Sequence, residues 1–82
     1  MGQPTQSIKL EVITATTDYS QLNSISILNQ STDTLNVLDL TNNGIIKLDE
    51  NQSVTLTSST GFVLPNLRLD SGGSIRASII TT

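Results

Sequence analysis

The residues best suited to chemistry in this chain are carboxylates, serines and a few basic side chains, because the sequence contains neither histidine nor cysteine. Without those two residue types, catalysis would need a serine activated by a lysine or a pair of carboxylates that act as acid and base. Lys9 and Lys47 stand in no Ser-x-x-Lys spacing, and the acidic residues are scattered. We therefore expect no enzymatic activity, no catalytic residue and no cofactor.

One segment imitates a metal-binding motif. Asp49-x-Asn51-x-Ser53 has the spacing of the first ligands of a calcium-binding EF-hand loop. However, Val54 stands where that loop requires glycine, and Thr60 stands where it requires a bidentate glutamate. A solvated turn explains the segment better, so we predict no metal site.

The composition limits the classes of partner that the protein could bind. Only 13% of the residues are charged, about half of the ~25% usual in globular domains. A net charge of −3 with four basic residues cannot form the basic stripe that follows a phosphate backbone or an anionic membrane. Neither nucleic acid nor a membrane is expected as a partner.

The elements that must position these residues are short strands. Apolar and polar residues alternate with period 2, and no segment repeats with the 3.6-residue period of a helix. Turn-forming residues separate the apolar runs, which are expected at about 7–14, 24–29, 35–40, 46–48, 53–57, 67–69 and 74–80. This pattern predicts an all-β fold, a small antiparallel β-sandwich or barrel of six to seven short strands with little or no helix. We expect residues 1–82 to form a single domain, with residues 1–6 as a flexible or partner-docked N-terminal arm.

The sequence Asn42-Asn43-Gly44 is the clearest turn. We expect a three-residue loop closed by Gly44 with positive φ, which would place Leu40 opposite Ile46.

A second expected hairpin concerns charge. If Leu69 pairs with Ile75, Arg68 lies directly opposite Arg76, and opposed like charges destabilise a sheet. Either both side chains reach water or lean diagonally towards Asp70, or they form a small anion- or carboxylate-binding patch for a partner subunit.

The core raises the question of self-association. A chain of 82 residues with two aromatic residues and no cysteine has a thin aliphatic core, and oligomerisation is one usual remedy. Some apolar residues break the alternation and should face away from the core, as interface residues do. They are candidate partner or oligomer contacts, together with the two arginines, unless bulges or a second packed sheet bury them: Ile13, Leu28, Ile45 and Ile80.

The stretch from Ser24 to Leu56 contains an apolar strand that ends in Asn29, a second strand, and then a Leu-turn-Ser-Val-Thr-Leu hairpin. This cadence resembles the core of small all-β virion structural proteins of tailed bacteriophages. The usual Pro-Gly of the turn is replaced here by Glu50-Asn51, and no functional residue can be carried over.

The resemblance implies a non-enzymatic capsid decoration or cement protein, located in the virion after assembly in the host cytoplasm. Its partners would be further copies of itself, in a homo-oligomer such as a trimer, and a major capsid or other virion protein. A head–tail connector or fibre component remains an alternative. A carbohydrate- or host-surface-binding module is another, although Tyr19 and Phe62 are the only aromatics that could stack on sugars.

Overall fold

The computed structural model describes residues 8–82, so the expected arm at residues 1–6 lies outside the described residues. The fold is all-β, as predicted. Its strands are β1 (Lys9–Ile13), β2 (Thr17–Tyr19), β3 (Ser24–Asn29), β4 (Leu35–Asp39), β5 (Ile45–Leu48), β6 (Ser53–Thr57), β7 (Leu67–Asp70) and β8 (Ala77–Thr81). Within residues 8–82 no helix is long and apolar enough to cross a membrane.

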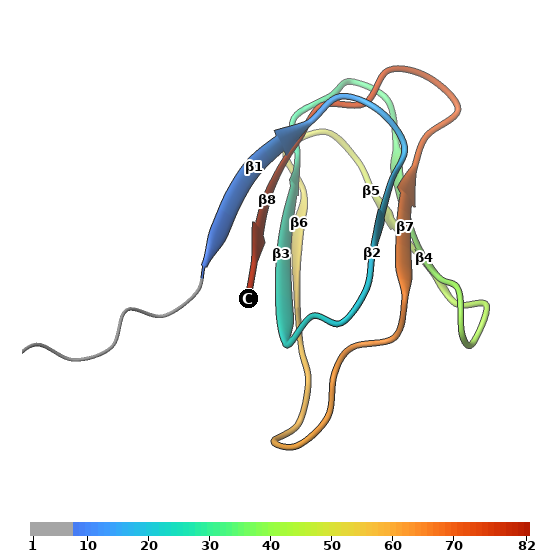
Figure 1. The fold of residues 1–82 in the computed structure, drawn as a ribbon. Helices are drawn as coiled ribbons and strands as arrows, with labels where there is room; N and C mark the ends of the chain where they lie inside the picture. The colour runs from blue at the N-terminus through green and yellow to red at the C-terminus, as the bar shows by residue number, and fades with distance from the viewer. Residues whose placement is uncertain (1–7) are drawn as a thin grey trace, which may run out of the picture.

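The strands form two antiparallel four-stranded sheets that face each other (Figure 1). Sheet A has the order β1-β8-β3-β6, and sheet B has the order β2-β7-β4-β5. The sandwich is therefore confirmed, with eight strands instead of six to seven. The strand absent from the prediction is β2, whose three residues Thr-Asp-Tyr are too few to show an alternation.

The chain is folded like one long hairpin with its bend between β4 and β5. The pairs β4–β5, β3–β6, β2–β7 and β1–β8 follow one another outwards from that bend. Rolling this hairpin brings β8 against β3 and β7 against β4, which completes the two sheets. Every connection except β4–β5 crosses from one sheet to the other. This is the strand order of a jelly roll, in which two sheets of one rolled ribbon enclose the core.

The core is aliphatic and lies between the sheets. Alternate residues of β3, β4, β7 and β8 point inward, as the period of 2 requires. The buried apolar residues are Ile13, Ile25, Ile27, Leu35, Val37, Leu48, Leu67, Leu69, Ala77 and Ile79. No aromatic residue belongs to this set, although Tyr19 packs against it.

Strand β1 has the opposite phase to the one expected. Leu10 and Val12 are 71% and 57% exposed, whereas Ile13 is 7% exposed and belongs to the core. The expectation that Ile13 faces away from the core is therefore wrong. The reason is that β1 is an edge strand whose inward side carries Glu11, which accepts a hydrogen bond from the hydroxyl of Tyr19 on β2.

The β4–β5 hairpin also differs from the expected register. Val37, and not Leu40, lies opposite Ile46. The left-handed conformation is taken by Asn43, with φ 62°, and not by Gly44. The pairing is thus shifted by an odd number of residues, which moves each side chain of β5 to the other face relative to β4.

The carboxylate of Asp39 explains this longer turn. Its Oδ1 accepts the backbone N–H groups of Thr41 at 2.9 Å and Asn42 at 3.0 Å, and its Oδ2 accepts the Asn42 side-chain amide. These hydrogen bonds, led by that of the Asn42 side chain, hold the pKa of Asp39 below its ordinary value. This Asx-type hydrogen bonding gives partners to backbone N–H groups of the turn, which would need other partners in a tighter hairpin.

A buried asparagine joins the two sheets at the end of β3. Asn29 is fully buried, and its Nδ2 donates to the carbonyls of Asp33 and Leu48, each at 2.9 Å. Its Oδ1 accepts the N–H of Ser31 at 3.0 Å. Because β3 belongs to sheet A and Leu48 ends β5 of sheet B, this side chain fixes two crossing connections at once.

Candidate interaction surface

The outward face of sheet A carries no charged side chain among its strand residues. With the core residues pointing inward, alternation directs the remaining residues of β1, β8, β3 and β6 to solvent. We call these residues the sheet-A face: Leu10, Val12, Ser78, Ile80, Ser24, Ser26, Leu28, Ser53, Thr55 and Thr57. They are aliphatic or carry a hydroxyl group.

The aliphatic members of this face are brought together by the strand register. Leu10 lies directly opposite Ile80, and Val12 lies opposite Ser78. On the other side of β8, Ser78 lies opposite Leu28. Shallow hollows flank β8 on both sides, one towards β1 and one towards β3 and β6. Residues from both ends of the sequence thus form one apolar patch surrounded by hydroxyl groups.

The outward face of sheet B is different in character. Its alternating outward positions include Asp18 on β2, Lys47 on β5, and Arg68 and Asp70 on β7. The two faces of the sandwich therefore separate by charge. Because desolvating charges is costly, an apolar contact is favoured on the sheet-A face.

Arg68 and Arg76 do not face each other, so the expected arginine pair is wrong. Strands β7 and β8 lie in different sheets, and the segment between them crosses the sandwich instead of forming a hairpin. Arg68 lies opposite Asp18 on β2 and binds it with both ends of the carboxylate, with Nε–Oδ1 at 2.8 Å and Nη2–Oδ2 at 3.0 Å. Arg76 is exposed just before β8, where its carbonyl accepts the N–H of Gln30.

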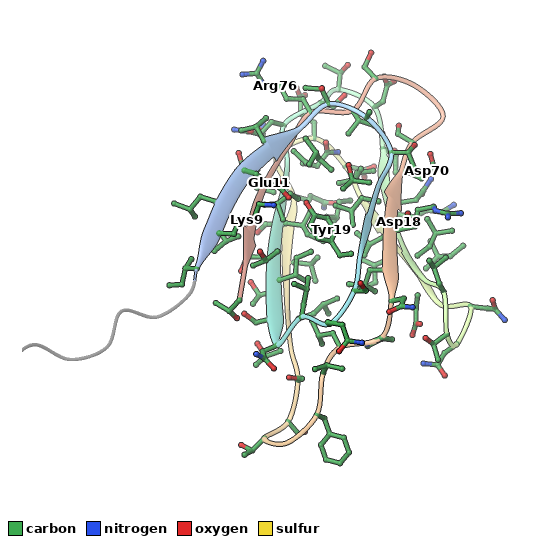
Figure 2. All side chains as sticks on the ribbon, viewed as in Figure 1. Lys9, Glu11, Asp18, Tyr19, Asp70 and Arg76 are labelled. Atoms are coloured by element: carbon green, nitrogen blue, oxygen red, sulfur yellow. The ribbon has the colours of Figure 1, made fainter. Side chains whose placement is uncertain are left out.

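The ion pair has an electrostatic consequence. The hydrogen bond from Arg68 is the largest cause that holds the pKa of Asp18 below its ordinary value. Figure 2 shows Asp18 beside sheet B and Arg76 at the upper end of the sandwich, just before β8. The two arginines therefore form no common anion-binding patch.

The edge between β1 and β2 is closed by a polar contact. Figure 2 shows Glu11 and Tyr19 pointing towards each other from the two sheets, and their side-chain oxygens are 2.5 Å apart. Lys9 adds an ion pair to Glu11 at 3.5 Å. The hydrogen bond from Tyr19 is the largest cause that lowers the pKa of Glu11, while burial is the largest cause that raises the pKa of Tyr19. The phenol therefore donates to a carboxylate, and it is not positioned to act as a base.

The opposite side of the sandwich, between β5 and β6, contains an apolar hollow. It has a volume of about 380 Å³, and its lining includes Ile46 of β5, Leu56 of β6 and Leu67 of β7. Leu64 and Pro65 from the β6–β7 loop complete the apolar wall. Among the residues that the structure describes, Asp39 is the only ionisable one in its lining, so no titratable pair converges there.

The contacts expected from phase breaks lie in three places. Leu28 and Ile80 belong to the sheet-A face, where Ile80 is 44% exposed. Ile45 is 57% exposed but lies on the outward face of sheet B, opposite Leu38. Ile13 is in the core. Their role as partner contacts stays a prediction, and the structure brings only Leu28 and Ile80 together.

Sequence reasoning missed Leu10 and Val12, which are the most exposed members of the patch. Their alternation with Lys9 and Glu11 marks a two-faced strand correctly but does not say which face is inward. The one available signal was Ile13, whose burial requires Leu10 and Val12 to point outward.

No group of three or more histidine, cysteine, aspartate or glutamate residues that could hold a metal ion occurs within residues 8–82. No family model matches the chain, and no curated protein or solved structure matches it.

Proposed function

We propose that the protein is a non-enzymatic structural component of a bacteriophage virion, a capsid decoration or cement protein that binds the shell through the sheet-A face and associates with itself. The observation that carries this proposal is the uncharged sheet-A face with its exposed aliphatic patch. A surface of this kind is costly to leave in water and typical of a protein contact.

The size of the patch agrees with a weak contact per copy. Leu10, Val12 and Ile80 are 71%, 57% and 44% exposed, so their complete burial would contribute roughly 3–5 kcal/mol. Losses of rotational and translational freedom offset much of this in a single contact. Linked copies bind far more tightly than one copy, which is how an oligomer on a repeating shell would hold.

The fold is compatible with this role, since double-sheet jelly rolls occur in viral capsid proteins as well as in lectins. A fold alone does not define a function. The resemblance of residues 24–56 to small virion proteins adds a second, independent argument.

Carbohydrate binding is the second candidate, and one observation favours it. Phe62, in the loop between β6 and β7, is 71% exposed, and exposed aromatic rings are common sugar-stacking surfaces. Tyr19 cannot assist, because it is half-buried and its hydroxyl is bonded to Glu11. If binding on a glycan array were lost in a Phe62→Ala variant, this function would replace the virion role.

The proposed function is tested by sedimentation with native phage particles. Wild-type protein should pellet with the particles, whereas the Leu10→Ser/Val12→Ser variant should lose most of this binding. Val63→Ser is the control, because Val63 is also strongly exposed, at 50%, but lies in the loop between β6 and β7. Equal loss in both variants, or no pelleting of the wild type, would contradict the proposal. If labelled protein covers the whole shell of the particle, decoration is supported. If the labelled protein binds only the neck or the fibres, the alternative virion locations are assigned instead.

A further inference from the structure

The four edge strands of the sandwich differ in how they are protected against pairing with other strands. Sheet A ends in β1 and β6, and sheet B ends in β2 and β5. Natural edges usually carry charged residues, proline or bulges that prevent such pairing. Lys9 and Glu11 lie on β1, Asp18 lies on β2 and Lys47 lies on β5. Strand β6, Ser-Val-Thr-Leu-Thr, has neither charge nor proline.

The free side of β6 presents regular backbone groups. Ser58 donates its N–H to the carbonyl of Asn23, and hydrogen-bonded residues alternate along an antiparallel ladder. Val54 and Leu56 therefore direct their backbone groups towards β3. Ser53, Thr55 and Thr57 direct theirs away from the sheet, where β6 has no neighbouring strand among residues 8–82.

We propose that β6 pairs with β6 of a second copy of this chain, antiparallel and about a two-fold axis through Thr55, so that two sheets A become one eight-stranded sheet. In this register Thr55 lies opposite Thr55 of the second copy, and Ser53 lies opposite Thr57. All three residues whose backbone groups point away from β3 are then paired, with about six backbone hydrogen bonds. The proposal specifies the self-association in the proposed function and rests on it.

Charge distinguishes β6 from the other three edges as the site for pairing with a second copy. A two-fold pairing of β1 through its central residue would oppose Glu11 to Glu11, and the same pairing of β2 would oppose Asp18 to Asp18. In β5 an axis through Lys47 would oppose Lys47 to Lys47, and an axis through Ile46 would place the charged Lys47 opposite the apolar Ile45. Because each copy carries a net charge of −3, two copies associate best where no charge is opposed to its like.

The inward side of β6 supports the same contact. Val54 and Leu56 are half-buried, and the pairing places Val54 of one copy opposite Leu56 of the other. Leu56 also lines the apolar hollow between β5 and β6, so the second copy covers surface that one chain leaves open. On the outward side, the threonines at the axis can hydrogen-bond to each other, a favourable cross-strand pair.

The test is cysteine cross-linking, which is clean because the chain has no cysteine. At the axis, Thr55→Cys would bring two Cα atoms to about 5.5 Å, within the range of about 4.4–6.8 Å that disulfides span. Ser53→Cys is the matched control on the same strand face. Its two copies would be separated along the strands by about 14 Å, too far for a disulfide. Under mild oxidation we expect Thr55→Cys to form covalent dimers and Ser53→Cys to stay monomeric.

Two mixtures of variants test which residues of the two β6 strands lie opposite each other. Ser53→Cys mixed with Thr57→Cys should form a mixed disulfide. The Thr55→Lys and Thr55→Glu variants should each dimerise at least about tenfold more weakly than wild type, and mixing them should restore dimers because their opposite charges then meet at the axis. Equal cross-linking of Thr55→Cys and Ser53→Cys, or no recovery on mixing the charged variants, would overturn the proposal.

The two proposals fail separately. If wild-type protein is a monomer in sedimentation equilibrium but pellets with phage particles through the sheet-A face, the β6 contact is wrong and the virion role stands. If Thr55→Cys cross-links but wild-type protein binds no particle, the β6 contact stands and the virion role is wrong.

Discussion

Replacing Asn29 by alanine should destabilise the fold more than any surface change, because its side chain joins both sheets. Asn29 is fully buried and makes three hydrogen bonds, to the carbonyls of Asp33 and Leu48 and from the N–H of Ser31. Alanine removes both donors and the acceptor. The partner groups of Leu48 and Ser31 lie where the contact is buried, so water cannot replace the lost partner without opening the structure.

The magnitude follows from the number of groups left without a partner. Each buried polar group that loses its hydrogen bond costs about 1–3 kcal/mol. With two such groups, and a third that is partly buried, we expect Asn29→Ala to lower the free energy of unfolding by about 3–5 kcal/mol. A domain of this size has a total stability of roughly 4–12 kcal/mol, so a large share would be lost.

Urea denaturation at a fixed protein concentration measures this loss. The matched control is Asn66→Ala, because Asn66 is exposed and no hydrogen bond of its side chain is found in the described structure. We expect the control to stay within about 0.5 kcal/mol of wild type. A value for Asn29→Ala as small as that of the control would refute the role of Asn29 as the link between the sheets.

Three further predictions concern the edge, the phase of β1 and the ion pair. Because the pKa of Glu11 in the folded state is lowered from 4.5, chiefly by the Tyr19 hydrogen bond, its contribution to stability is present above pH 4.5 and is lost as the pH falls through the folded-state pKa. Tyr19→Phe should raise the pKa of Glu11 in an NMR titration, and the free energy of unfolding should then fall less steeply at acid pH. An unchanged pKa of Glu11 would argue against the contact. Ile13→Ala should lower the free energy of unfolding in urea by about 2–5 kcal/mol, whereas Leu10→Ala should lower it by less than about 0.5 kcal/mol. The reverse order would show that Leu10, and not Ile13, faces the core. Arg68→Ala should shift the urea midpoint only slightly, and less at high salt because salt screens an exposed ion pair, and it should leave the dimer measured by sedimentation intact.

Alternation along the chain was sufficient to predict an all-β sandwich or barrel, because period 2 is a local property of each strand, but it did not distinguish between these two architectures. It placed Ile25, Ile27 and Leu69 correctly in the core. It could not identify the inward face of β1, since an edge strand can bury either of its faces and the choice depends on the distant Tyr19.

Sheet membership was less accessible to the sequence. The turn-like segment Ser71-Gly72-Gly73 is compatible with a hairpin, yet it connects strands of opposite sheets. That choice is made by non-local pairing, in which β8 lies between β1 and β3. For the same reason the sequence predicts Leu28 and Ile80 only as separate contacts, and the strand register is needed to place them on one face with Leu10.

Cryo-electron microscopy of native phage particles that carry the protein addresses the proposed function most directly. The sheet-A face should lie against the shell, with Leu10 and Ile80 covered, and the charged outward face of sheet B with Arg68 and Asp18 should point to solvent. A density map in which sheet B contacts the shell and the sheet-A face is exposed to water would contradict this assignment.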